Sequence, residues 1–176
     1  MNLLKRAMLT AAIICLIAAT GLGDSEQATF SAKLTGFKEV GNTGPVNSPG
    51  SGQFQLTIGN TGDDLTYTLT YSALSSSVTQ AHVHFGEPGV SAGVMFFLCT
   101  NLGNGPAGTP ACPNPSGTVT GTITAANIVG PAGQNVNALD FASALKIIRG
   151  GVGYANVHTQ KFPVGEIRGQ VTSDDN

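Results

Sequence analysis

Residues 79–86 read Thr-Gln-Ala-His-Val-His-Phe-Gly, a run in which apolar and polar side chains alternate. A period of two indicates a β-strand with one buried face and one face toward solvent. On such a strand His82 and His84 share the polar face and lie roughly 6.5–7 Å apart, given a rise of ~3.3 Å per residue. That spacing lets both rings lean toward a single ion. The apolar face carries Ala81, Val83 and Phe85, and the polar face carries Gln80, His82 and His84.

The third histidine of the chain lies in a second alternating segment, residues 153–159. Ala155 and Val157 share one face there, while Asn156 and His158 share the other. The pattern therefore predicts that all three histidines are exposed on polar strand faces, outside the core. If the two histidine strands are neighbours in one sheet, we expect the three rings to converge on one point.

Three converging imidazoles suit a copper or zinc ion, with water in an open coordination position. Soft Cu(I) would favour an additional Met or Cys ligand, and the sequence does not place Met95 beside the histidines. Binding should weaken as the pH falls through about 6.5, because protonated rings cannot ligate. The alternative is that the rings only make hydrogen bonds on the strand surface, His82 and His84 to Glu87 or Gln80.

The same alternation recurs along the chain and predicts an all-β fold. Only 10% of the residues are charged and 24 are glycines, which fits short strands joined by tight turns. We expect an antiparallel Greek-key β-sandwich or barrel of seven to nine strands. One short helix is predicted near 138–148, with Asn137 as its N-cap and Gly150-Gly151 at its end. Besides residues 79–86, the predicted strands are 29–34, 53–58, 65–71, 93–98, 116–125, 153–159 and 166–171.

Residues 1–23 have the pattern of a secretory signal peptide. Lys5 and Arg6 precede an apolar run at 7–19, and small residues follow it. A lipoprotein anchor on Cys15 is disfavoured by the bulky residue before it, and an uncleaved anchor would be short for a bilayer span. The pattern predicts a secreted or periplasmic protein whose single domain spans 24–176.

The charge and cysteine content of residues 24–176 limit the possible partners. Loss of the two basic leader residues leaves six basic against ten acidic ones, a net charge of −4. This balance argues against nucleic acid and against anionic membranes as partners. Two cysteines remain, Cys99 and Cys112, and an even pair in an exported chain predicts a disulfide. A thiolate metal pair is the weaker alternative, because the spacing is far from Cys-x-x-Cys.

Motifs for enzymatic chemistry are scarce. Glu166 and Arg168 share a predicted strand face beside His158, and a solvated ion pair is favoured over an acid/base role. No Ser-His-Asp order, phosphate-binding loop or closely spaced carboxylate pair supports a hydrolase.

Four segments together resemble the CHRD domain, which is named from chordin and also occurs in small secreted bacterial proteins. The resemblance spans Phe30 to Val171 and implies a binding or structural module whose partner is a protein or another extracellular ligand. The segments are Ala-His-Val-His-Phe-Gly at 81–86, Leu-Asp-Phe at 139–141, Asn-Val-His-Thr at 156–159 and Pro-Val-Gly-Glu-Ile-Arg-Gly-Gln at 163–170.

A fainter resemblance is to copper–zinc superoxide dismutase. The run from His82 to Gly86 is similar to the copper-binding strand of that family, and His158 lies on a late strand as another ligand does there. This resemblance implies a Greek-key barrel with histidines on its outer face, and a copper-dependent redox enzyme as the alternative function. A fourth histidine and the zinc-binding loop have no counterpart in this chain.

Overall fold

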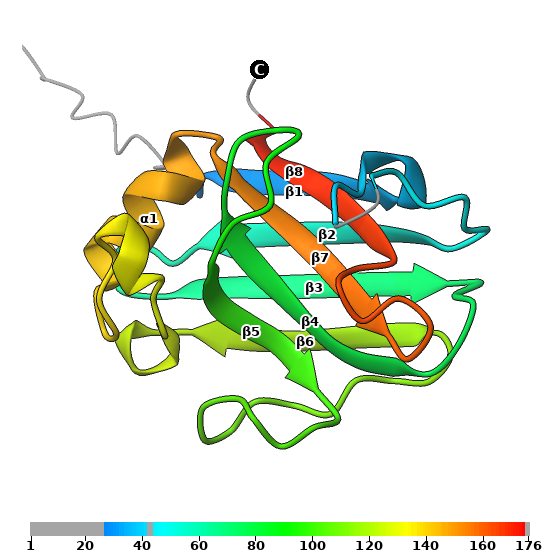
Figure 1. Cartoon of the computed structure of the whole chain (residues 1–176). Coiled ribbons are helices and arrows are strands. Elements are labelled where there is room, and N and C mark those ends of the chain that lie inside the picture. Colours follow the sequence, from blue (N-terminus) through cyan, green and yellow to red (C-terminus); the bar gives the residue numbers. More distant parts are fainter. Residues whose placement is uncertain (1–26, 42–43, 175–176) are drawn as a thin grey trace, which may run out of the picture.

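The computed structural model describes residues 27–41 and 44–174, so the predicted signal peptide lies outside the described part. The described chain forms eight antiparallel strands and one α-helix, which confirms the predicted all-β fold (Figure 1). The strands are β1 (Thr29–Thr35), β2 (Ser51–Ile58), β3 (Leu65–Ser72), β4 (Val78–Phe85), β5 (Val94–Thr100), β6 (Gly117–Ile123), β7 (Gly153–Thr159) and β8 (Ile167–Ser173). Three single 3₁₀ turns, η1 (Gly36–Lys38), η2 (Ala125–Asn127) and η3 (Ala132–Gln134), and the helix α1 (Phe141–Arg149) complete the fold.

The strands form one sheet in the order β5-β4-β7-β8-β1-β2-β3-β6, which curls into a nearly closed barrel. β3 and β4 follow each other in the sequence but lie far apart in the sheet, as the predicted Greek-key connections require. The two edge strands, β5 and β6, face each other across the remaining seam. Tyr67 on β3 reaches over this seam and donates a hydrogen bond to the Leu98 carbonyl on β5, at 2.5 Å.

The core fills the inside of the barrel with the apolar members of each alternating strand. β3 shows the pattern clearly, because Leu65, Tyr67, Leu69 and Tyr71 are buried while the threonines between them face outward. Burying a side chain of this size contributes roughly 1.5–3 kcal/mol to folding. The same alternation continues on β4 and β7, so their histidines lie on the outer face of the barrel.

The predicted helix is present but begins later than expected. Its N-cap is Asp140, whose carboxylate accepts the backbone N–H of Ser143 at 3.0 Å. Asn137 was the wrong choice because Leu139 has a left-handed conformation, φ 70°, which no helix residue adopts. The N–H of Leu139 instead bonds the Ile128 carbonyl. The predicted end is confirmed, since α1 stops at Arg149 and Gly151 has φ 67°.

The disulfide between Cys99 and Cys112 is confirmed, with Cα atoms 5.0 Å apart. Cys99 is near the end of β5, and the loop that the bond closes is also held by Asn101. The Asn101 side chain donates to the Val78 and Cys112 carbonyls and accepts the Cys112 N–H. In the described part of the chain, no helix combines the length and apolar character needed to cross a bilayer.

Candidate metal centre

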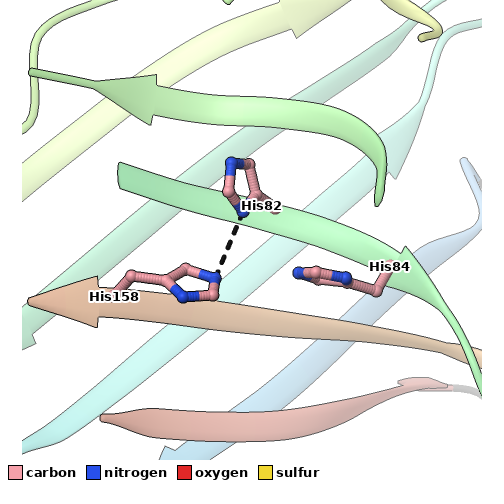
Figure 2. Close-up of side chains that lie close together, drawn as sticks. All are labelled: His82, His84 and His158. Atoms are coloured by element: carbon pink, nitrogen blue, oxygen red, sulfur yellow. Dashed lines mark hydrogen bonds between the residues drawn. The ribbon is translucent and has the colours of Figure 1, made fainter. Parts of the chain in front are cut away.

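The three histidines meet on the outer face of two neighbouring strands. β4 supplies His82 and His84, and β7 supplies His158 (Figure 2). The antiparallel register pairs Gln80 with His158 and His82 with Asn156, so His158 lies diagonally opposite His82. One ring nitrogen from each histidine lies within 4.8 Å of those of the other two. The predicted convergence is therefore confirmed.

The prediction that these histidines are exposed was wrong. The exposed fractions of His82, His84 and His158 are 3%, 7% and 6%. Cross-strand aromatic neighbours fill the space on either side. The ring of Phe97 stands edge-to-face with His82 at 4.4 Å between centroids, and the ring of Tyr154 stacks parallel to His84 at 4.7 Å. The sequence pattern showed which residues lie outside the barrel core, but the outer face here is itself covered.

Two backbone carbonyls fix the proton positions of two rings. The Nδ1 of His84 lies 2.9 Å from the Ala92 carbonyl, and the Nδ1 of His158 lies 3.1 Å from the Pro163 carbonyl. Since a carbonyl only accepts, both Nδ1 atoms carry protons, and both Nε2 atoms carry lone pairs. The expected partners Glu87 and Gln80 do not hold the rings: His84 and His158 bond main-chain carbonyls instead, and His82 bonds the ring of His158.

The third ring completes the hydrogen-bond assignment. The Nδ1 of His82 lies 3.2 Å from the Nε2 of His158, so His82 donates to His158. The Nε2 atoms of His82 and His84 are then buried lone pairs, and neither has a hydrogen-bond partner. Buried polar atoms without partners are rare in folded proteins and call for an explanation.

Burial also keeps the three rings neutral. It lowers the pKa of His82 to about 2, with the neighbouring His158 and His84 contributing. It lowers the pKa of His84 to about 4, and it lowers the pKa of His158 despite the bond to Pro163. Neutral imidazole is the form that ligates metals. The loss of ligating rings that the sequence suggested near pH 6.5 is therefore shifted to lower pH.

Arg168 on β8 does not form the expected ion pair with Glu166. Its guanidinium stacks on the ring of Tyr154, 3.4 Å from the centroid, and donates to the Glu87 carbonyl at 3.0 Å. The carboxylate of Glu166 instead accepts hydrogen bonds from three other groups, the Ser48 hydroxyl, the Ser75 N–H and the Thr159 hydroxyl. These hydrogen bonds outweigh the effect of burial and hold the pKa of Glu166 below its usual range.

Sequence reasoning missed Glu39, which lies beside the histidine face. Its side chain is 4% exposed and accepts a hydrogen bond from the Nδ2 of Asn156, the residue between Tyr154 and His158 on the outer face of β7. Burial raises the pKa of Glu39 to about 7, although Asn156 and Arg168 both favour the ionised form. The one sequence signal nearby is Gly165, with φ 130°, where a Cβ would lie 2.7 Å from both carboxylate oxygens.

Comparison with known proteins identifies a family. The family model of the CHRD domain matches residues 30–171, which covers six of the eight strands completely and most of β1 and β8. Neither the curated proteins nor the solved structures contain a significant match.

Proposed function

The chain belongs to the CHRD domain family, and we propose that it is an exported binding or structural module that holds one copper or zinc ion through His82, His84 and His158. The observation that carries the proposal is the convergence of three buried imidazoles, in which the Nε2 of His84 has no hydrogen-bond partner. A bound ion would use this lone pair, whereas leaving a buried polar atom unsatisfied costs about 1–3 kcal/mol.

The surroundings of the rings support a metal site. Ligating histidines commonly donate their second ring N–H to a carbonyl or carboxylate, which fixes the ring orientation. His84 and His158 do this with the carbonyls of Ala92 and Pro163. The 3.2 Å between His82 Nδ1 and His158 Nε2 also suits two ligands that each lie about 2.0–2.1 Å from one ion.

The covering of the site favours a module over a copper-dependent redox enzyme. Catalytic metal sites keep a coordination position open to substrate. Here the rings are almost fully buried, and Phe97 and Tyr154 occupy the space beside them. The disulfide is typical of oxidising compartments and supports a secreted or periplasmic location. We propose that the partner is a protein or another extracellular ligand.

Metal titration of the purified metal-free protein tests the proposal. Isothermal calorimetry with Cu(II) and Zn(II), and elemental analysis after desalting, should give one ion per chain. A double variant, His82→Ala with His158→Ala, should bind none. Gln80→Ala is the matched control, because Gln80 lies on the same strand and face but outside the cluster. Equal binding by the wild type and the double variant would refute the site.

Superoxide turnover separates the two functions. Metal binding without turnover supports the module. Turnover by the copper-loaded protein that is lost in His84→Ala would instead support the redox enzyme.

A further inference from the structure

The ligands of the candidate site carry no charge of their own. Among the described residues, the group of metal-ligating side chains consists of three histidines and includes no carboxylate or thiolate. Neutral ligands leave the whole charge of a bound ion uncompensated. The ion would also be surrounded by side chains rather than by water, because the rings are 3–7% exposed.

A buried cation lies next to this site. Arg168 is 3% exposed and stacks on Tyr154, whose ring in turn stacks on His84. Since β7 lies between β4 and β8 in the sheet, the Tyr154 ring stands between the imidazole and the guanidinium. The positive charge of Arg168 therefore lies close enough to His84 to repel a cation held by its imidazole.

The nearby carboxyl groups compensate this charge weakly. Glu166 directs its oxygens to Ser48, Ser75 and Thr159. Glu87 is exposed and offers Arg168 only its backbone carbonyl. Glu39 is a buried acid that accepts a hydrogen bond from Asn156 on β7, and burial raises its pKa to about 7, so it is only partly ionised at neutral pH.

From this charge arrangement we infer that the site selects monovalent Cu(I) over Zn(II) and Cu(II). The inference rests on the proposed metal-binding function and adds the charge of the ion to it. The free-energy cost of moving an ion from water into a buried site grows with the square of its charge. It is therefore about four times as large for a divalent ion as for a monovalent one. Repulsion from Arg168 adds a further difference, in proportion to the charge.

Charge replaces ligand softness as the basis of this selection. A thioether or thiolate is the usual signature of a Cu(I) site. Met95 is fully buried in the barrel core, and Cys99 is in the disulfide, so neither belongs to the cluster. Imidazole also ligates copper, and three neutral imidazoles give Cu(I) a complete trigonal set without a charged ligand.

Affinities of the wild-type protein test the inference directly. Cu(I) would be measured without oxygen, in ascorbate, by competition with a chromophoric Cu(I) chelator, and Zn(II) and Cu(II) by competition with chelating dyes at pH 7. We expect the Cu(I) dissociation constant to be the lowest of the three, and the bound copper to have a more positive reduction potential than the aqueous ion. A site that binds Zn(II) or Cu(II) at least as tightly as Cu(I) overturns the inference. If the protein binds none of the three ions, the proposed function is overturned instead.

Variants of Arg168 separate its charge from its packing. Arg168→Gln should lower the ratio of Cu(I) to Zn(II) affinity by roughly tenfold. Removal of the cation takes away more electrostatic repulsion from Zn(II) than from Cu(I), because the repulsion is proportional to the charge of the ion. Arg168→Lys keeps the charge and should keep the ratio. Lys33→Gln removes the same charge from an exposed position on β1 and should leave the ratio unchanged. If Arg168 has a purely structural role, both the Gln and the Lys variant should instead lose affinity for Cu(I) and for Zn(II) by the same factor.

A further variant covers the case in which Arg168→Gln does not fold. Glu39→Gln removes a negative charge from the same side of the sheet and should raise the ratio of Cu(I) to Zn(II) affinity at pH 8. No change in that ratio contradicts the inference.

Discussion

His82 Nδ1 lies 3.2 Å from His158 Nε2, although 76 residues separate the two histidines in the sequence. Because the Nδ1 proton of His158 is held by the Pro163 carbonyl, the proton between the two rings belongs to His82. His82 cannot offer this nitrogen to a metal until its proton has moved to Nε2. Two of the three rings are therefore in the tautomer that ligates through the converging nitrogen, and His82 is in the other.

Metal binding should change the tautomer of His82 alone. In the metal-free protein we expect all three rings to carry the proton on Nδ1. After one equivalent of Cu(I) or Zn(II), His82 should carry it on Nε2, while His84 and His158 keep theirs on Nδ1 beside Ala92 and Pro163. Long-range ¹H–¹⁵N NMR spectra of the imidazole rings distinguish the two forms. An unchanged His82 pattern in the saturated protein would contradict this assignment.

The metal-free protein should lose stability as the pH falls below about 6.5. The pKa of His84 drops to about 4 and that of His82 to about 2 on folding, so the unfolded chain binds more protons in this window. Each of these histidines then lowers the free energy of unfolding by up to about 1.4 kcal/mol per pH unit, until its folded pKa is reached. Urea denaturation in a chelator at pH 7, 6 and 5 measures this slope. His84→Gln should flatten it, and equal slopes in the two proteins would count against the buried-ring account.

Glu39→Gln should stabilise the protein at high pH. The folded pKa of Glu39, about 7, lies above its ordinary value, so the wild type loses stability as the pH rises from about 4.5 to 7. Glutamine keeps an acceptor for Asn156 without the buried charge. The variant should gain up to about 3 kcal/mol over the wild type at pH 8 and be close to it at pH 4. Urea denaturation at the two pH values, with exposed Glu87→Gln as control, should show a pH-dependent gain for Glu39→Gln only.

Loss of the disulfide should destabilise the fold without abolishing it. The bond between Cys99 and Cys112 closes a short loop, for which chain entropy predicts about 3 kcal/mol of stabilisation. The double variant Cys99→Ala with Cys112→Ala should lower the urea midpoint by the corresponding amount and keep the β-sheet circular dichroism spectrum. The same midpoint in both proteins would show that the loop is held by Asn101 instead.

Two alanine variants distinguish the observed helix start from the predicted one. Asp140→Ala removes the side chain that accepts the Ser143 N–H and should lower the thermal midpoint. Asn137→Ala changes an exposed side chain and should leave the midpoint unchanged. If Asn137→Ala lowers the thermal midpoint more than Asp140→Ala does, Asn137 is the N-cap, as the sequence predicted.

The strands could be predicted from the sequence because a barrel has an inside and an outside. A period of two in segments such as 65–71 records which side chains face the core, and β3 follows it, whereas on β5 the consecutive residues Met95 and Phe96 are both in the core. The convergence of His82, His84 and His158 followed from the same alternation together with pairing of the two histidine strands.

Burial of the site could not be predicted, because it depends on segments distant in sequence. Glu39 precedes Asn156 by 117 residues, and no local pattern marks it as a buried acid. Glu166 and Arg168 have the spacing of a strand pair, but their actual partners come from other elements. The late start of the helix likewise depends on the left-handed Leu139 and its bond to Ile128.

The pairing of β1 with β8 joins the first and the last strand of the described chain, so the sheet is continuous only when both strands are present. During synthesis from the amino terminus, β1 has β2 as a partner early, but its other edge stays open until the last strand has emerged. β7, which carries His158, and β8 form a hairpin at the end of this sequence of events. An incomplete chain can therefore present His82 and His84 but not the full ligand set. Occupancy of the candidate site would then report that β7 has paired with β4.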